Sequence, residues 1–106
     1  MLENYHGEKE AYVMKAVLKK HIEELTEEEL QDVLRRDYLR RLTRYRITDD
    51  SYKKKYGRDL ESFEKAHIVK KQNYTFEVES DAQEWELAID GIRTIEKKLK
   101  ELLGAS

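Results

Sequence analysis

Apolar residues near the carboxyl end of the chain recur at alternating spacings of three and four, which is the period of one helix face. Ser80 and Gln83 stand at capping-box spacing ahead of this series, and Gly104 follows it. The pattern therefore predicts a helix over residues 80–103. The apolar positions that we expect to pack along it form a seam of Trp85, Ile89, Ile92, Ile95, Leu99 and Leu102.

A second series predicts a long helix in the first half of the chain. Thr26 and Glu29 form a capping box, and Gly57 provides a stop. The spacing continues through Asp49, which favours one helix over residues 27–56. An alternative break at Thr48, whose hydroxyl could cap a separate short helix, stays open. The apolar members of the series are Leu30, Val33, Leu34, Tyr38, Leu42, Tyr45, Tyr52 and Tyr56.

Three further segments complete the predicted fold. A first helix covers about residues 8–25 after a flexible start at 1–7, and Asp59 caps a short helix that ends near Val69. Tyr74, Phe76 and Val78 alternate with polar residues, which is the period of a half-buried strand. We expect an extended segment over 74–78, laid across helices or paired with a second copy of the chain.

These elements predict an all-α fold with three main helices and one short helix in a single helical domain, residues 1–106. We expect the 27–56 and 80–103 helices to pack antiparallel along their seams. Each helix would be longer than the roughly 33 Å diameter of a compact chain of this size. We therefore expect an intertwined or coiled-coil-like homodimer.

The composition excludes several classes of protein. The chain has no cysteine, which excludes a disulfide framework and thiol catalysis. Charged residues make up 42% of it, but the formal net charge is only -2, so no global attraction to nucleic acid or membranes is expected. No run of about 18 apolar residues and no signal-peptide pattern occurs, so we expect a cytoplasmic protein that does not bind a membrane.

Histidines are the natural candidates for metal binding or catalysis. His6 follows Glu3 and His67 follows Glu64 at the spacing used in carboxylate-bridged di-iron bundles. The remaining carboxylates of such a site would interrupt the apolar seam, and His21 has no nucleophile at a recognisable spacing. No phosphate-binding glycine loop or nucleophile elbow is present. We expect no metal, no cofactor and no enzymatic activity.

Arginines gather in the second helix. Arg36, Arg40 and Arg44 are spaced by four, with Tyr38 and Tyr45 interleaved, so one face could bind phosphates or an acidic partner. The alternative is a solvated face that pairs with acids of a neighbouring helix. We favour that alternative, because no DNA-reading motif accompanies the arginines and six acids lie between Glu23 and Asp32. Nucleic-acid binding stays a second hypothesis.

Two stretches, YKKKYGRDLESFE over 52–64 and VESDAQEWELAIDGIRTIEKKLKEL over 78–102, resemble the small helical antitoxin-like proteins of archaea and bacteria. The resemblance implies a cytoplasmic interaction protein that binds and neutralises a protein toxin, usually as a dimer. This chain has a longer amino-terminal portion and lacks a ribbon-helix-helix arm, so operator binding is not implied. We expect the partner-binding residues to be Phe63, Tyr74, Phe76 and Val78, with the extended segment adding to a sheet edge of the toxin.

Overall fold

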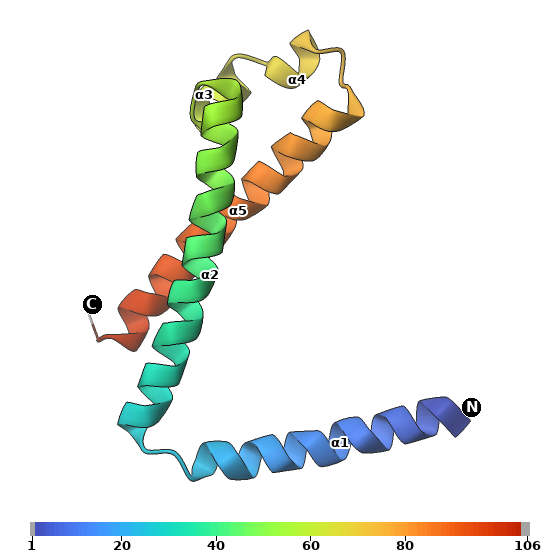
Figure 1. The fold of residues 1–106 in the computed structure, drawn as a ribbon, viewed down its shortest axis with the longest axis vertical. Coiled ribbons are helices and arrows are strands. Elements are labelled where there is room, and N and C mark those ends of the chain that lie inside the picture. Colours follow the sequence, from blue (N-terminus) through green and yellow to red (C-terminus); the bar gives the residue numbers. More distant parts are fainter. Residues whose placement is uncertain (1, 105–106) are drawn as a thin grey trace. The chain divides into compact units, whose positions relative to one another are not determined.

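The computed structural model describes residues 2–104, with side chains from residue 7 onward. They form five helices and no strand, which confirms the all-α class (Figure 1): α1 (Leu2–Glu23), α2 (Glu27–Tyr56), α3 (Leu60–Lys65), α4 (Ile68–Lys71) and α5 (Phe76–Leu102). The chain divides into two compact units between Leu34 and Arg35, and α2 contributes to both.

The predicted bounds of α2 are confirmed by the hydrogen bonds at its start and the turn at its end. The Glu29 amide donates to Thr26 Oγ1 at 3.1 Å, and the Thr26 hydroxyl donates to the Glu29 carboxylate at 3.1 Å. Gly57 follows the helix with a φ of 66°, a left-handed conformation that glycine adopts at little cost. The alternative break at Thr48 is wrong, because its hydroxyl donates to the Arg44 carbonyl within the unbroken helix.

The predicted extended segment over 74–78 is wrong. Helix α5 begins at Phe76 and is capped by Thr75, whose side chain accepts from the Val78 amide, so Ser80 lies inside the helix. Asn73 and Tyr74 have φ values of 57° and 53° and turn the chain into the helix. Tyr74 lies in the connecting loop, whereas Phe76 and Val78 lie in the first turn of α5. Of these three alternating residues, only Val78 is buried.

The predicted short helix of residues 59–69 is two helices. Asp59 caps α3 as predicted, accepting from the Ser62 amide at 2.8 Å. His67 then adopts the left-handed region with a φ of 53°, which ends α3 and redirects the chain into α4. Nothing in the spacing of apolar residues marks this break.

The first unit contains α1, which begins at Leu2 rather than at about Glu8. Within this unit, every side chain from Gly7 to Glu24 is exposed. Its helical character therefore rests on local backbone hydrogen bonds and not on a core.

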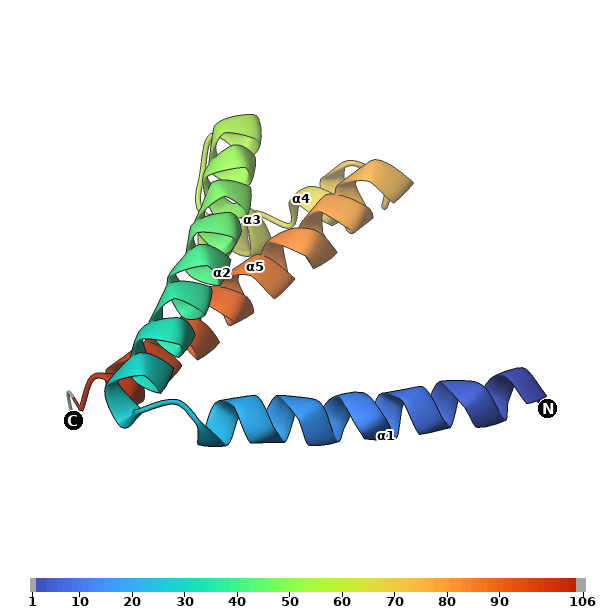
Figure 2. The ribbon, with the colours of Figure 1, turned by 60° about the horizontal axis from the view of Figure 1, so that its bottom comes forward.

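In the second unit, α2 and α5 run in opposite directions and cross, as Figures 1 and 2 show. Lys55 contacts Asp81 near one end, Tyr45 packs against Gly91 near the crossing, and Lys98 lies over the Tyr38 ring beyond it. Helices α3 and α4 connect the pair at the end where it diverges. The opposite directions of the two helices are as predicted, but the helices cross and diverge instead of packing side by side along their seams.

The core of this unit is built on Phe63, Val78 and Trp85. Trp85 is fully buried, and its ring lies 5.3 Å from that of Phe63 and 5.9 Å from that of Tyr56 between centroids. Aromatic rings at such distances add to the stabilisation by burial alone. Leu60, Ile68 and Val69 of the short helices pack against this cluster, which is why α3 and α4 hold their places.

Candidate functional site

The predicted seam of α5 packs against other parts of the same chain. Trp85 and Ile95 of the seam are buried, as is Ala88 on the same face. The other seam members are half-buried: Ile89, Ile92, Leu99 and Leu102. Much of this face is therefore occupied without a second copy.

The residues predicted to bind a partner do not form one surface. Phe63 and Val78 are 1% and 4% exposed and belong to the core, whereas Tyr74 and Phe76 are 58% and 87% exposed. Only Tyr74 and Phe76 can reach a partner in this conformation. Because Phe76 is helical, addition of a strand to another protein's sheet is no longer the mode of binding to expect.

A buried carboxylate lies at the centre of the α2 and α5 pair. Asp49 is 8% exposed, and its Oδ1 accepts from Trp85 Nε1 at 2.8 Å. Its Oδ2 pairs with Lys53 Nζ at 3.0 Å. Position 49 fits the apolar helical spacing that the sequence shows over residues 27–56. That spacing gives no sign that the Asp49 side chain faces the indole of Trp85.

A second polar network joins the same two helices nearer to α4. Lys55 Nζ and the Tyr56 hydroxyl each donate to Asp81 Oδ2 at 2.6 Å. Burial alone would raise the pKa of Asp81, but these two hydrogen bonds and the Lys55 charge outweigh it and hold the pKa below its ordinary value. Burial, together with the hydrogen bond to Asp81, raises the pKa of Tyr56 to about 12. This network is structural, since it ties the helices together and leaves no group with a pKa near neutrality.

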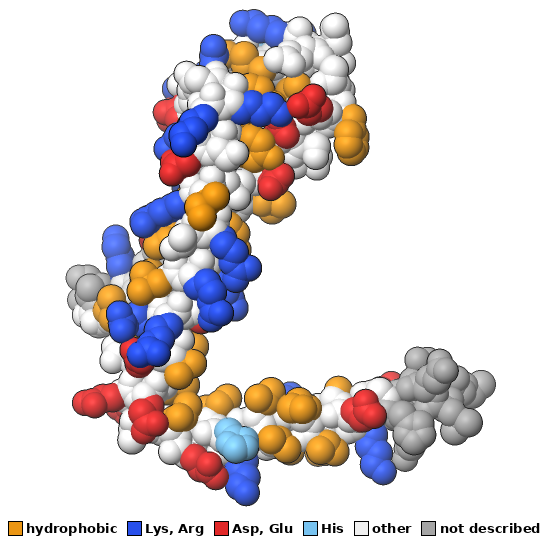
Figure 3. Space-filling view, in the orientation of Figure 1, with side chains coloured by type: hydrophobic (Ala, Val, Ile, Leu, Met, Phe, Trp, Pro, Cys, Tyr) orange, Lys and Arg blue, Asp and Glu red, His pale blue; other side chains and the backbone are white. Residues whose placement is uncertain are grey.

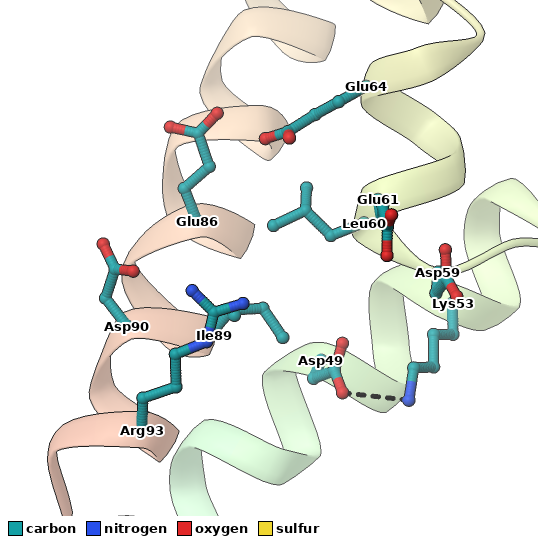
Figure 4. A pocket seen from close by; sticks show the side chains of 10 residues that line it. All are labelled: Asp49, Lys53, Asp59, Leu60, Glu61, Glu64, Glu86, Ile89, Asp90 and Arg93. Carbon is teal, nitrogen blue, oxygen red and sulfur yellow. Dashed lines mark ion pairs between the residues drawn. The ribbon is translucent and has the colours of Figure 1, made fainter.

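An acidic groove of about 520 Å³ opens beside Asp49 (Figure 4). Glu64 of α3 and Glu86 and Asp90 of α5 line it, along with Arg93. Burial, a hydrogen bond with Glu64 and the charges of Glu64 and Asp90 raise the pKa of Glu86. No serine, cysteine or histidine nucleophile lines the groove, so its chemistry is that of a solvated carboxylate cluster.

The sequence offered two Glu–His pairs as candidate metal ligands, and the structure describes the side chains of one pair, Glu64 and His67. Among the described residues, no group of three or more histidine, cysteine, aspartate or glutamate side chains could hold a metal ion. His67 is exposed, stands at the start of α4, and lines a depression with Glu64 and Glu86. Glu3 and His6 lie outside the described side chains.

The arginines singled out in the sequence belong to a larger basic region that we term the basic end. Antiparallel packing brings the last turns of α5 beside residues 35–46 of α2, with Arg46 paired to Glu96 at 3.2 Å. Arg44 lines a shallow depression with Arg41 and Tyr45, and Arg40 pairs with Asp37 at 3.5 Å. Figure 3 shows Lys and Arg side chains gathered over the middle of α2. The basic end comprises Arg35, Arg36, Arg40, Arg41, Arg44, Arg46, Lys97, Lys98 and Lys100.

Helix α1 carries an exposed apolar face. Six large apolar side chains are between 42% and 78% exposed. They are Tyr12, Val13, Met14, Val17, Leu18 and Ile22. Figure 3 shows hydrophobic side chains gathered along α1. Scattered apolar residues are normal on a surface, whereas a gathering of large ones on a single helix is typical of interaction sites. No helix among the described residues has the length and apolar character needed to cross a membrane.

Comparison with known proteins assigns no family or function to the chain. No protein-family model, curated protein or solved structure matches the chain.

Proposed function

We propose that the protein is a non-enzymatic interaction protein that assembles through the apolar face of α1, and that the occupant of this face is a second copy of the chain. The observation that carries the proposal is the complete exposure of α1 from Gly7 to Glu24. An isolated helix of this length is marginal in water, because most helical stability in proteins comes from packing. A partner helix would supply the missing burial.

Heptad spacing and charge favour a second α1, parallel and in register. Met14 and Leu18 of the apolar residues, together with Ala11 and His21, recur at spacings of three and four, as seam positions of a coiled coil do. Val17 and Ile22 take flanking positions, and Tyr12 and Val13 lie outside this seam. Glu10 and Lys15 then occupy the flanking positions that face each other across a parallel pair, which gives two attractive contacts per dimer. His21 would be a polar seam residue, of the kind that specifies register at some cost in stability.

Light scattering of the full chain tests this interface. We expect a mass twice the 12.8 kDa of one chain at micromolar concentration, and a return to one chain in Leu18→Lys, which places two charges against each other in the seam. Leu87→Lys is the matched control, since Leu87 is 69% exposed on α5 and the same change there should leave the dimer intact.

Charge reversal tests the register. Glu10→Lys should weaken the dimer by placing like charges opposite Lys15 of the other chain, and Glu10→Lys with Lys15→Glu should restore it. A monomeric wild-type protein with a helical circular dichroism spectrum would show the self-assembly proposal to be wrong. A dimer indifferent to Leu18→Lys would show that another surface forms it.

We further propose that the homodimer is an antitoxin. It is supported by the resemblance of residues 52–64 and 78–102, and by exposed Tyr74 and Phe76, which can contact a toxin beside α4. Co-expression with the neighbouring reading frame should yield a complex that Tyr74→Ser and Phe76→Ser disrupt while the homodimer persists. Purification of native complexes that contain only copies of this chain would remove the basis for a toxin partner.

A further inference from the structure

A depression of about 270 Å³ lies where α3, α4 and α5 meet. Its apolar floor belongs to the aromatic core or packs against it, and consists of Phe63, Ile68, Val69 and Ala82. Because these side chains are held in place by the packing around Trp85, the floor exists before any ligand arrives. Preformed concave apolar surfaces with a few polar groups are the usual sites for small ligands.

Two carboxylates without a basic partner line this depression. Figure 4 shows Glu64 of α3 reaching toward Glu86 of α5, and burial together with Glu64 raises the pKa of Glu86. Within the described part of the chain, neither carboxylate forms an ion pair, and Lys65, which is next to Glu64 in the sequence, pairs with Glu61 instead. Adjacent carboxylates repel each other when both are charged, so a cation placed between them is stabilised.

A base and an aromatic ring also line the depression. Lys70 has no ion pair with any residue that the structure describes, and Tyr74 is 58% exposed. His67 and Tyr74, which precede and follow α4, both have a φ of 53°. Non-glycine residues in this left-handed region cost about 1–3 kcal/mol each and cluster at ligand sites. The depression therefore has groups of both charges around an apolar floor.

We propose that this depression binds a free apolar α-amino acid. Glu64 and Glu86 accept hydrogen bonds from its ammonium group, Lys70 donates to its carboxylate, and its side chain lies on the apolar floor. A simple cation would leave Lys70 without a role, and a simple anion would be repelled by the carboxylate pair. The volume is below the roughly 300–1,000 Å³ of pockets for drug-sized molecules, which suits a ligand of this size. The site does not depend on the assembly of α1, because all of its residues belong to the second unit.

Isothermal titration calorimetry of the full chain with L-leucine at pH 7.5, where an ordinary histidine is largely neutral, tests the inference. We expect one molecule bound per chain with a Kd of about 1 mM or tighter. Leucinamide, which lacks the carboxylate and resembles the amino-terminal residue of a peptide, should bind about tenfold more weakly. So should 4-methylpentanoate, which lacks the ammonium group, because each loses a hydrogen bond between charged groups.

Charge-matched variants make the test specific. Glu86→Gln and Lys70→Gln should each lower the affinity for leucine about tenfold. The controls are Glu79→Gln and Lys71→Gln, which remove the same charges from exposed positions of the same two helices outside the lining of the depression. Both controls should leave the affinity nearly unchanged.

Three results would each show the inference to be wrong. The first is a Kd for leucine weaker than about 10 mM. The second is binding of leucinamide or 4-methylpentanoate as tight as that of leucine. The third is an equal loss of affinity in the site variants and in their controls, with all four proteins folded by circular dichroism.

Discussion

At the scale of single residues, the α2 and α5 pair is joined by carboxylates that lie among aromatic rings. Asp49 accepts from the buried indole of Trp85, and Asp81 accepts from Tyr56 and Lys55. Buried donors of this kind need an acceptor, because an unsatisfied one costs about 1–3 kcal/mol. The described chain has no buried side-chain nitrogen or oxygen without a partner. Asp49 therefore satisfies the indole N–H that the aromatic core buries.

Replacing Asp49 tests this role. Asp49→Leu should lower the free energy of unfolding by about 1–3 kcal/mol, because it leaves the Trp85 N–H buried without an acceptor. Asp49→Asn is the control, since its amide oxygen can accept the same hydrogen bond, and it should cost less. Urea unfolding followed by Trp85 fluorescence measures both. Equal losses in the two variants would show that the charge pair with Lys53, and not the indole hydrogen bond, is what matters.

Asp81 predicts a pH dependence. Its pKa is lowered in the folded state relative to the ordinary value of 3.8, so the folded protein releases this proton more readily than the unfolded chain. The stabilisation is complete above the unfolded pKa and is lost as pH falls through the folded one. Asp81→Asn should therefore destabilise the protein near neutrality and by less with each step below about pH 4. A difference between variant and wild type that stays constant over this range contradicts the assignment.

At the scale of elements, the crossing of α2 and α5 depends on a glycine. A methyl group built on Gly91 would lie 2.6 Å from Cε2 of Tyr45, well inside contact distance. The absent side chain thus makes room for the tyrosine ring. Glycine inside a helix is unfavourable by about 1 kcal/mol relative to alanine. At position 91 this cost is offset because the missing side chain lets the two helices approach closely.

A double-mutant cycle at the crossing tests this account. Gly91→Ala should destabilise the wild-type protein, because overpacking costs about 1–3 kcal/mol and exceeds the gain in helix propensity. In a Tyr45→Ala background the clash is gone, and Gly91→Ala should stabilise by up to about 1 kcal/mol. Thermal unfolding of the four proteins gives the coupling energy. Stabilisation of the same size in both backgrounds would show that Tyr45 does not limit the approach.

At the scale of the whole molecule, the two units differ in what stabilises them. The second unit has a buried aromatic cluster, whereas α1 has no buried side chain between Gly7 and Glu24. Regions with few buried apolar contacts open at lower free energy than a core does. The same molecule therefore contains a stable helical pair and a helix whose stability depends on what it contacts.

Hydrogen exchange at two protein concentrations should resolve this difference. Amides of α5 around Trp85 should be protected at both concentrations, because they exchange only when the core opens. Amides of α1 should exchange quickly in dilute solution and become protected as concentration rises and dimers form. Mass spectrometry of peptides from each helix measures this. Strong protection of α1 at every concentration would show that the chain covers this helix by itself.

The sequence alone determined the helical class, the start of α2 at the Thr26 capping box, its end at Gly57 and the cap of α3 at Asp59. These features are local, because a capping side chain bonds an amide three residues away and a left-handed glycine ends a helix regardless of the rest of the fold. The apolar spacing likewise marked which face of α5 packs, since burial of a helix follows its own period.

Only the tertiary structure decided which of these residues act together. The alternation of Tyr74, Phe76 and Val78 fits both a strand and a helix start, and the choice followed from the turn at Asn73 and the burial of Val78 against Trp85. Asp49 became a core residue because an indole from a distant helix faces it, and the α5 bases joined the α2 arginines because the helices run antiparallel. Such pairings join residues far apart in the chain, and a pattern with a period of a few residues carries no information about them.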